Sequence, residues 1–308
     1  MKYNTKYWQE MRLVVPKIIK LFGNPKIAWV RYQYCQERSS ADIKARRGDI
    51  QYPHNIIFLA GMGLSGSSWL KNILGHIPGY YTRRTPIPYD IAYRQDICDS
   101  AFKYTSSDTY SLFKTHLNPK KENLDCIRRN GVDKIIVLYR DFRDVILSEC
   151  HRLLKYPKPR DAYDFVDYQR LGFDKALMHL LKETGPRQVA WLDGWRQHAK
   201  KQPQDFHFLT FEELRQDTYT AYKRVLDFYQ IQLSDDVVRQ ALASSLGRKE
   251  VLENIAESQV LPWARSSTFR RGEVGGWKEE FKKDHINLAK DKLGQALIDN
   301  GFETDFNW

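Results

Sequence analysis

Short apolar runs alternate with helical patterns of apolar and polar residues through most of the chain. The runs with the β-branched, apolar character of buried strands cover residues 56–60, 112–113, 134–139 and 206–211. Apolar residues at helical spacing follow three of these runs, over residues 67–74, 145–154 and 212–229. Strands separated by helices predict an α/β fold with a central, mostly parallel sheet and helices on both of its faces.

The chain divides into an extension and one domain. Residues 1–50 form a basic N-terminal extension with eleven Lys or Arg against four Asp or Glu, and residues 51–308 form the α/β domain. Residues from about 155 to 190 are helical without strand character, so we expect an inserted helical cap there. Residues 1–35 mix bases with apolar residues at helical spacing. This pattern fits peripheral contact with a membrane or, more commonly, a terminal helix packed on the domain.

The composition is that of an ordinary globular protein with an excess of positive charge. Of the 308 residues, 42% are hydrophobic and 28% are charged, and the net charge of +11 favours a polyanionic partner. Nucleic acid is disfavoured because the sequence carries no motif of the common nucleic-acid-binding folds. The scattered cysteines argue against a zinc site and a disulfide framework. Together with the lack of a secretory signal or a long apolar run, they predict a cytoplasmic protein.

The most informative segment is the turn after the first apolar run, Gly61 to Ser68. Gly61 and Gly66 have the spacing of a phosphate-cradling Walker A loop, and two hydroxyl residues follow. The lysine that a nucleotide triphosphatase carries after the second glycine is replaced by Ser67. Backbone N–H groups of such a loop converge on an anion, and the following helix adds its dipole. The segment therefore predicts an oxyanion site, although glycine-rich turns of this kind also serve packing alone.

Two further segments carry cations beside hydroxyl or glycine residues. Arg140 ends an apolar run, and Ser148 lies eight residues later, a little over two helical turns on. Both can bind a terminal phosphate, or Arg140 can simply pair with Asp141 or Asp144. The third segment is Arg270-Arg271-Gly272, which on its own is equally typical of a solvated surface turn.

Taken in order, these segments resemble the sulfotransferases that use 3′-phosphoadenylyl sulfate (PAPS) as donor. The family's Lys-Ser-Gly-Thr-Thr-Trp-Leu is similar to residues 64–70, and its arginine and serine of the second motif match Arg140 and Ser148. Its Arg-Lys-Gly followed by Gly-Asp-Trp-Lys resembles residues 270–278. Lys-Thr-His is present at residues 114–116, and Tyr-Glu-Asp-Leu resembles residues 211–214. The resemblance covers roughly residues 54–282 and leaves out residues 1–50.

The resemblance implies a P-loop-like sulfotransferase domain over residues 51–308. It implies sulfuryl transfer from PAPS to a hydroxyl or amine of a small-molecule acceptor, with 3′,5′-diphosphoadenosine (PAP) as product and without a metal. His116 would be the general base and Lys114 would stabilise the leaving phosphate. The donor-binding residues carried over are Gly63, Leu64, Ser65, Gly66, Ser67, Ser68, Trp69, Arg140, Ser148, Phe211, Arg270, Arg271 and Gly272. Trp69 and Phe211 would contact the adenine, and both types are as common in a core.

Three departures from the family pattern bear on these expectations. Leu64 stands where the family usually has a lysine or arginine, and Gly276 replaces an aspartate. The Thr-Val pair that serves dimerisation is missing after Phe281, which leaves the oligomeric state open. A nucleotide-binding protein without turnover and a nucleotide kinase on a related fold remain as alternatives. The acceptor's identity is also open: tyrosines 80, 81, 89 and 93 would line an aromatic pocket or lie in surface turns.

Overall fold

The computed structural model describes residues 51–82, 96–103, 105, 109–155, 166–243 and 272–308. The described strands form a five-stranded sheet in the order β2-β3-β1-β4-β5, and every pairing in it is parallel. The strands are β1 (Ile56–Gly61), β2 (Tyr80–Thr82), β3 (Tyr110–Thr115), β4 (Ile135–Tyr139) and β5 (Phe206–Thr210). The predicted α/β fold with a parallel central sheet is confirmed. The sequence pattern missed β2, which is only three residues long, and underestimated the length of β3.

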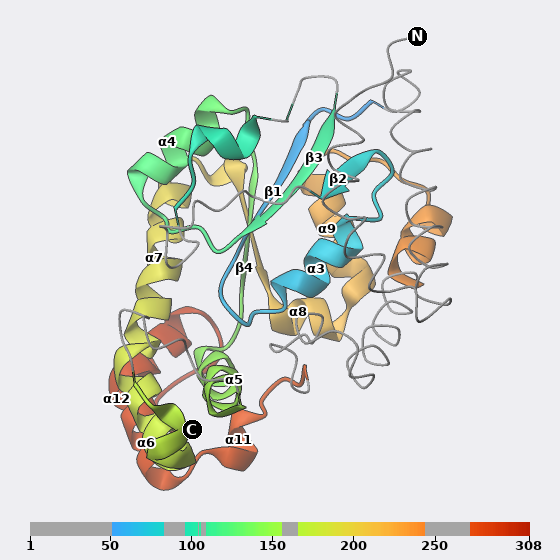
Figure 1. Ribbon diagram of the computed structural model, residues 1–308. Helices are drawn as coiled ribbons and strands as arrows, with labels where there is room; N and C mark the ends of the chain where they lie inside the picture. The colour runs from blue at the N-terminus through green and yellow to red at the C-terminus, as the bar shows by residue number, and fades with distance from the viewer. Residues whose placement is uncertain (1–50, 83–95, 104, 106–108, 156–165, 244–271) are drawn as a thin grey trace, which may run out of the picture.

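Helices cover both faces of this sheet (Figure 1). They are α3 (Ser67–Leu74), α4 (Lys121–Arg129), α5 (Phe142–Lys155), α6 (Tyr168–Glu183), α7 (Gly185–Lys201), α8 (Phe211–Gln216), α9 (Thr218–Phe228), α11 (Trp277–Glu280) and α12 (Lys283–Asp299). Alternate residues of β1 serve the two layers: Phe58 packs with the α5–α7 side, and Leu59 packs with α3 and α9. Within the described residues, no helix has both the length and the apolar character needed to cross a bilayer.

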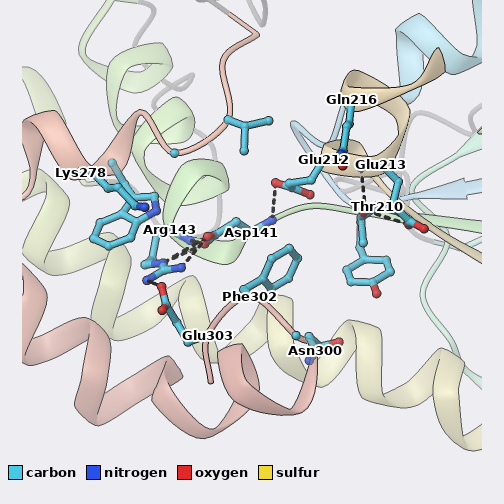
Figure 2. Close-up of a pocket in the computed structure, with 15 residues that line it drawn as sticks. Asp141, Arg143, Thr210, Glu212, Glu213, Gln216, Lys278, Asn300, Phe302 and Glu303 are labelled. Atoms are coloured by element: carbon cyan, nitrogen blue, oxygen red, sulfur yellow. Dashed lines mark hydrogen bonds and ion pairs between the residues drawn. The ribbon is translucent and has the colours of Figure 1, made fainter. Parts of the chain in front are cut away.

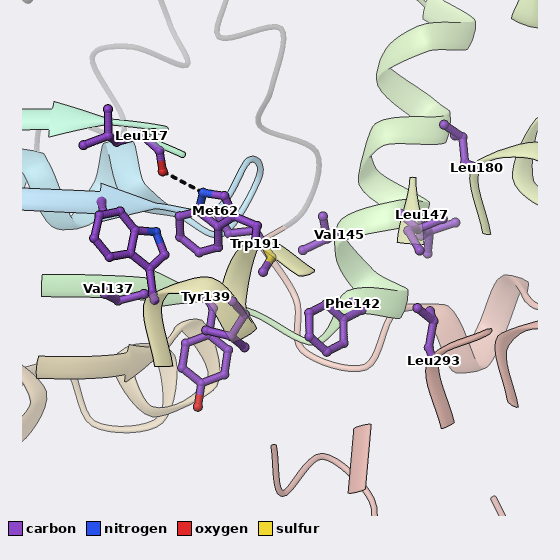
Figure 3. Packing of buried hydrophobic residues seen from close by; sticks show 14 of the residues in the cluster. Met62, Leu117, Val137, Tyr139, Phe142, Val145, Leu147, Leu180, Trp191 and Leu293 are labelled. Atoms are coloured by element: carbon purple, nitrogen blue, oxygen red, sulfur yellow. Dashed lines mark hydrogen bonds between the residues drawn. The ribbon is translucent and has the colours of Figure 1, made fainter. Parts of the chain in front are cut away.

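The larger of the two cores lies beneath α5, α6, α7 and α12 (Figure 3). Phe142 and Val145 of α5 are buried in it, and the Trp191 indole of α7 donates a 2.8 Å hydrogen bond to the Leu117 carbonyl. This bond ties α7 to the segment that directly follows His116. The described part of the predicted cap, α6 and the start of α7, packs on α5 and α12. Its closure over an acceptor stays a prediction.

The strand register brings the candidate residues to one edge of the sheet. Ala60 pairs with Thr115, Gly61 with Leu138, and Tyr139 with Thr210. The carboxyl ends of β1, β3, β4 and β5 therefore lie at one edge of the sheet. The segments that follow these strands, including Arg140, meet at that edge. This is the edge at which parallel α/β sheets bind ligands.

Tyrosine side chains gather at the opposite edge of the sheet. Tyr80 is 2% exposed, packs against Tyr52 and Tyr110, and donates a hydrogen bond to the His54 carbonyl. Both sequence-based interpretations of Tyr80, an acceptor pocket or a surface turn, are therefore wrong. The residue begins a strand too short to show a periodic pattern. Tyr89 and Tyr93 lie outside the described residues, as do Arg270, Arg271 and the extension.

Candidate active site

The loop between β1 and α3 has the backbone shape of an anion cradle. Gly66 caps α3 in the left-handed conformation (φ 78°), and Leu64 is also left-handed (φ 61°). Ser65 donates its hydroxyl to the Met62 carbonyl over 2.7 Å, so this side chain holds the turn closed from inside. The first N–H groups of a helix have no partner within it, so the start of α3 suits an anion.

The two serines that follow the loop have different surroundings. Ser67 is 4% exposed and packs on Gly61, where an added Cβ would lie 2.4 Å from the Ser67 Cβ. Gly61 is therefore required for the close approach of the helix to the strand end. Ser68 is exposed on the first turn of α3 and can present its hydroxyl to a ligand.

An aromatic side chain closes the other flank of the loop. Phe211, at the start of α8, is 4% exposed, and its ring lies against Gly66. The Trp69 ring meets it edge-on at 6.1 Å, and the Arg140 guanidinium carbon lies 4.5 Å from its ring centre. The structure thus brings together three separate sequence segments: the loop with Trp69, Arg140, and Phe211.

Replacing Gly66 with alanine should destabilise the fold by about 2 kcal/mol or more, because a left-handed non-glycine residue costs about 1–3 kcal/mol. The added Cβ would also lie 2.6 Å from Phe211 Cδ2. Gly63→Ala is the matched control: no heavy atom lies within 4 Å of its added Cβ. Urea unfolding should show less than about 0.5 kcal/mol for Gly63→Ala. Equal losses in the two variants would contradict this account.

Lys114 and His116 form a pair beside the loop. They stand two residues apart at the end of β3, so both side chains point to one side of the extended chain. Lys114 Nζ lies 2.7 Å from His116 Nε2, and His116 Nδ1 lies 2.5 Å from the Gly61 carbonyl oxygen. A carbonyl only accepts, which assigns the proton to Nδ1 and leaves the Nε2 lone pair as the basic site.

Arg140 stands at the end of β4 and is 6% exposed. It donates from Nη1 to the Leu64 carbonyl at 3.4 Å and from Nη2 to the Glu273 carbonyl at 2.5 Å. Its Nη2 also lies 3.3 Å from Asp144 Oδ2, so the pairing with Asp144 that the sequence left open does occur. Among the described residues its Nε is buried without a partner. One guanidinium therefore links the anion loop, α5 and the turn before α11.

The turn that carries the third motif is fastened to α5. Asp144 accepts the Gly275 N–H at 2.8 Å and the Trp277 N–H at 3.1 Å. Burial raises the pKa of the Asp144 carboxyl, while Arg140 and the two backbone donors oppose that shift. Gly272, the described residue of Arg270-Arg271-Gly272, is left-handed (φ 63°). Ser148 lies one turn beyond Asp144 on the same face of α5 and is 8% exposed.

A second arginine of the motif, Arg143, is buried in a network that the sequence did not reveal. It makes a bidentate pair with Asp141, at 3.0 and 2.7 Å, and its Nη1 lies 2.5 Å from Glu303 Oε1. Its guanidinium lies against the rings of both Trp277 and Trp308, with its carbon 3.8 and 4.4 Å from the two ring centres. The network joins α5 to the chain end, 160 residues away, which explains why no local pattern predicted it.

A pocket of about 550 Å³ borders this network (Figure 2). Its lining includes Asp141, Arg143 and Glu212 but none of Lys114, His116 and Arg140. The predicted catalytic pair and Arg140 therefore lie outside this pocket. No cluster of His, Cys, Asp and Glu in the described ranges has the arrangement of metal ligands.

Glu212, on the pocket wall, should make stability depend on pH. Burial raises the pKa of its carboxyl to about 7, and Oε1 accepts the Asp141 N–H. The carboxyl's ordinary pKa is 4.5, and its pKa in the folded state is about 7. Between these two pH values the folded state binds more protons than the unfolded state, so stability falls as pH rises. Glu212→Gln should thus stabilise the protein by up to about 3 kcal/mol at pH 8 and by little at pH 4.5.

The matched control is the neighbouring residue, Glu213. Burial raises its pKa, but hydrogen bonds from Thr210 and Arg224 outweigh burial, and the net pKa is lowered. Glu213→Gln should therefore destabilise the protein at pH 8, with an effect that fades as pH falls through the lowered pKa. Denaturant unfolding at a series of pH values from 8 down to below 4.5 measures both. A Glu212→Gln variant that is less stable than wild type at pH 8 would contradict the assignment.

These observations define a class: a parallel α/β protein with a glycine-rich loop, shaped like an anion cradle, at the carboxyl edge of its sheet. Residues 54–301 match the model of the family described as "Sulfotransferase domain". The chain therefore belongs to the sulfotransferase family, and the resemblance seen in its motifs is confirmed.

Curated relatives and solved structures agree with this assignment. A flavonol 3-sulfotransferase of Flaveria bidentis is 24% identical over 271 residues, 78% of this chain and 82% of the relative. Cytosolic sulfotransferase 15 of Arabidopsis thaliana is 23% identical, over 85% of this chain and 78% of the relative. Mouse sulfotransferase SULT7A1 complexed with PAP has a TM-score of 0.57 at 20% identity, over 87% of this chain and 95% of that one. A retinol dehydratase in complex with androsterone and PAP has a TM-score of 0.52 at 18% identity, over 80% of this chain and 82% of that one. These two structures establish the fold.

Proposed function

We propose that this chain transfers the sulfuryl group of PAPS to a hydroxyl or amine of a small-molecule acceptor, with His116 as general base. The observation that carries the proposal is the Lys114–His116 pair held beside the anion loop by the Gly61 carbonyl. This pair would set a base and a cation together at the edge where the loop would bind an anionic group. Family membership supports the reaction class.

The residues present fit the donor. The left-handed Gly66 opens the loop at the N-terminus of α3, which suits the 5′-phosphosulfate. Arg140, with a buried Nε that has no partner in the described part of the chain, suits the 3′-phosphate together with Ser148 on α5. Trp69, which is half-buried, offers aromatic surface for the adenine, and the buried Phe211 ring that it meets edge-on would support it. Arg270, Arg271 and Gly272 would complete the 3′-phosphate site. Three solved neighbours are PAP complexes, which supports this choice of donor.

The bound donor would supply an activated sulfuryl group on a phosphate leaving group. His116 Nε2 would take the proton of the acceptor hydroxyl or amine, since Nδ1 is committed to Gly61. Lys114 would donate to the negative charge that develops on the leaving side. Because it stands within hydrogen-bond distance of His116, it would need only to rotate about its flexible stem. The loop N–H groups would fix the reacting centre in place.

The acceptor class and location belong to the proposal. Names of the relatives include flavonol sulfotransferases, and the retinol dehydratase structures hold androsterone or retinol. All are small molecules with hydroxyl or keto groups, which supports a small-molecule acceptor here. Three relatives are named cytosolic sulfotransferases, which supports a cytoplasmic enzyme. Membrane contact through residues 1–35 and the oligomeric state stay predictions.

One observation favours a second candidate, a protein that binds the nucleotide without turnover. Leu64 provides no side-chain cation at the loop, and its carbonyl accepts from Arg140. Calorimetry with PAP and with ATP tests donor recognition. We expect PAP to bind and ATP to bind far more weakly, since Ser67 replaces the Walker lysine. Tight ATP binding without PAP binding would instead indicate a nucleotide kinase, and PAP binding without sulfuryl transfer would favour the second candidate.

A further inference from the structure

Asp144 is the most buried acid beside the candidate 3′-phosphate site. It is fully buried (0% exposed), and three donors converge on its carboxylate: the Arg140 guanidinium and the N–H groups of Gly275 and Trp277. We propose that Asp144 is a positioning residue for the 3′-phosphate: it holds Arg140 and the Gly272–Trp277 turn at one fixed spacing. The inference rests on the proposed function, because it assumes that the nucleotide carries a 3′-phosphate.

The contacts of Arg140 show how the carboxylate acts. Two backbone carbonyls and Asp144 hold the terminal nitrogens, and the plane rests on Phe211. A guanidinium is a rigid fork, so fixing its terminal nitrogens also fixes the direction of its Nε–H. That Nε is the buried donor without a partner among the described residues. Removing the Asp144 charge would leave a buried guanidinium held only by neutral carbonyls.

The same carboxylate also holds the Gly272–Trp277 turn. Gly275 and Trp277 bracket the end of the turn that begins at Gly272. Asp144 is thus bonded both to the arginine after β4 and to the backbone that follows the Arg-Arg-Gly motif. Ser148 lies one helical turn further along α5, so Asp144 sits between the residues that would contact the phosphate. The positions of Arg140 and of the Gly272–Trp277 turn therefore depend on one side chain that would not touch the nucleotide.

Nucleotide preference separates this role from a merely structural one. Calorimetry compares PAP with adenosine 5′-phosphate, which lacks the 3′-phosphate. Wild type should prefer PAP. In Asp144→Asn the PAP affinity should fall about 10–100-fold, the loss expected for one misaligned charged hydrogen-bond site, while the monophosphate affinity changes less than about threefold. Asp144→Glu, which keeps the charge on a longer arm, should give an intermediate preference and serves if the asparagine variant does not fold.

Asp141→Asn is the matched control. It makes the same chemical change three residues earlier, at a buried acid that pairs with Arg143 instead of Arg140. We expect it to lower stability and leave the preference for PAP unchanged. A folded Asp144→Asn or Asp144→Glu variant with the wild-type preference, or an equal loss for both nucleotides, would overturn the positioning role and leave donor binding standing. A wild-type chain without preference for PAP would overturn the donor proposal, and the inference with it.

Discussion

Replacing His116 with alanine should lower kcat for sulfuryl transfer by about 10²–10⁴-fold, the usual contribution of a positioned general base. His116 Nδ1 is bonded to the Gly61 carbonyl, so its Nε2 is the basic atom, and it stands beside Lys114 at the end of β3. Alanine would leave the acceptor proton without a base. The affinity for PAP should change little, because none of the donor-binding roles proposed above falls on His116.

The control for this variant is His54→Ala. His54 precedes β1 at the opposite edge of the sheet and packs on Tyr229. The His54→Ala variant should retain the wild-type kcat. Steady-state rates and calorimetry on both variants separate chemistry from binding. If His116→Ala kept the wild-type kcat, or lost activity only in proportion to a loss of PAP affinity, His116 would not be the base.

Lys114→Met should lower kcat by about 10²–10³-fold, the magnitude of a lost donor to developing charge. The expectation is sharpened by Leu64, which supplies no cation from the loop. Lys114 would therefore stabilise the leaving group without a second side chain at that position. The methionine keeps much of the aliphatic stem, so the variant removes mainly the charge.

The converse change, Leu64→Lys, should restore part of the activity that Lys114→Met loses, by about tenfold, the effect of roughly 1.4 kcal/mol of charge stabilisation. Leu64 already has a left-handed backbone, so lysine meets the same backbone conformation there. Leu64→Met is the neutral control and should restore nothing. Equal effects of Leu64→Lys and Leu64→Met in the Lys114→Met background would show that charge at this position is not what the loop lacks.

Local sequence signals predicted the part of the site that local structure builds. The run from Ile56 through Leu74 combines an apolar strand, a glycine-rich turn and an amphipathic helix, and α3 begins and ends where the pattern predicts. Lys114 and His116 follow the end of an apolar run, so parallel topology alone brings them to the loop. Arg140 reached the same edge for the same reason.

Long-range contacts account for what the sequence could not predict. The packing of Phe211 against Gly66 joins residues that are 145 positions apart, and no local sequence pattern at either residue predicts this contact. Asp144 and Arg143 stand in a motif whose arginine and serine drew attention, yet their partners lie at residues 275, 277 and 303. The two arginines of one segment therefore have different environments: Arg140 bonds to the loop, and Arg143 lies against two tryptophans. Only the fold separates them.

The most direct test of the account is transfer of labelled sulfuryl from PAPS to a panel of small hydroxyl and amine acceptors, with full-length wild type and His116→Ala side by side. We predict labelled product with at least one acceptor class and a loss of that product in the variant. Binding of PAP without labelled product on any acceptor would contradict the proposed enzyme and leave a nucleotide-binding protein.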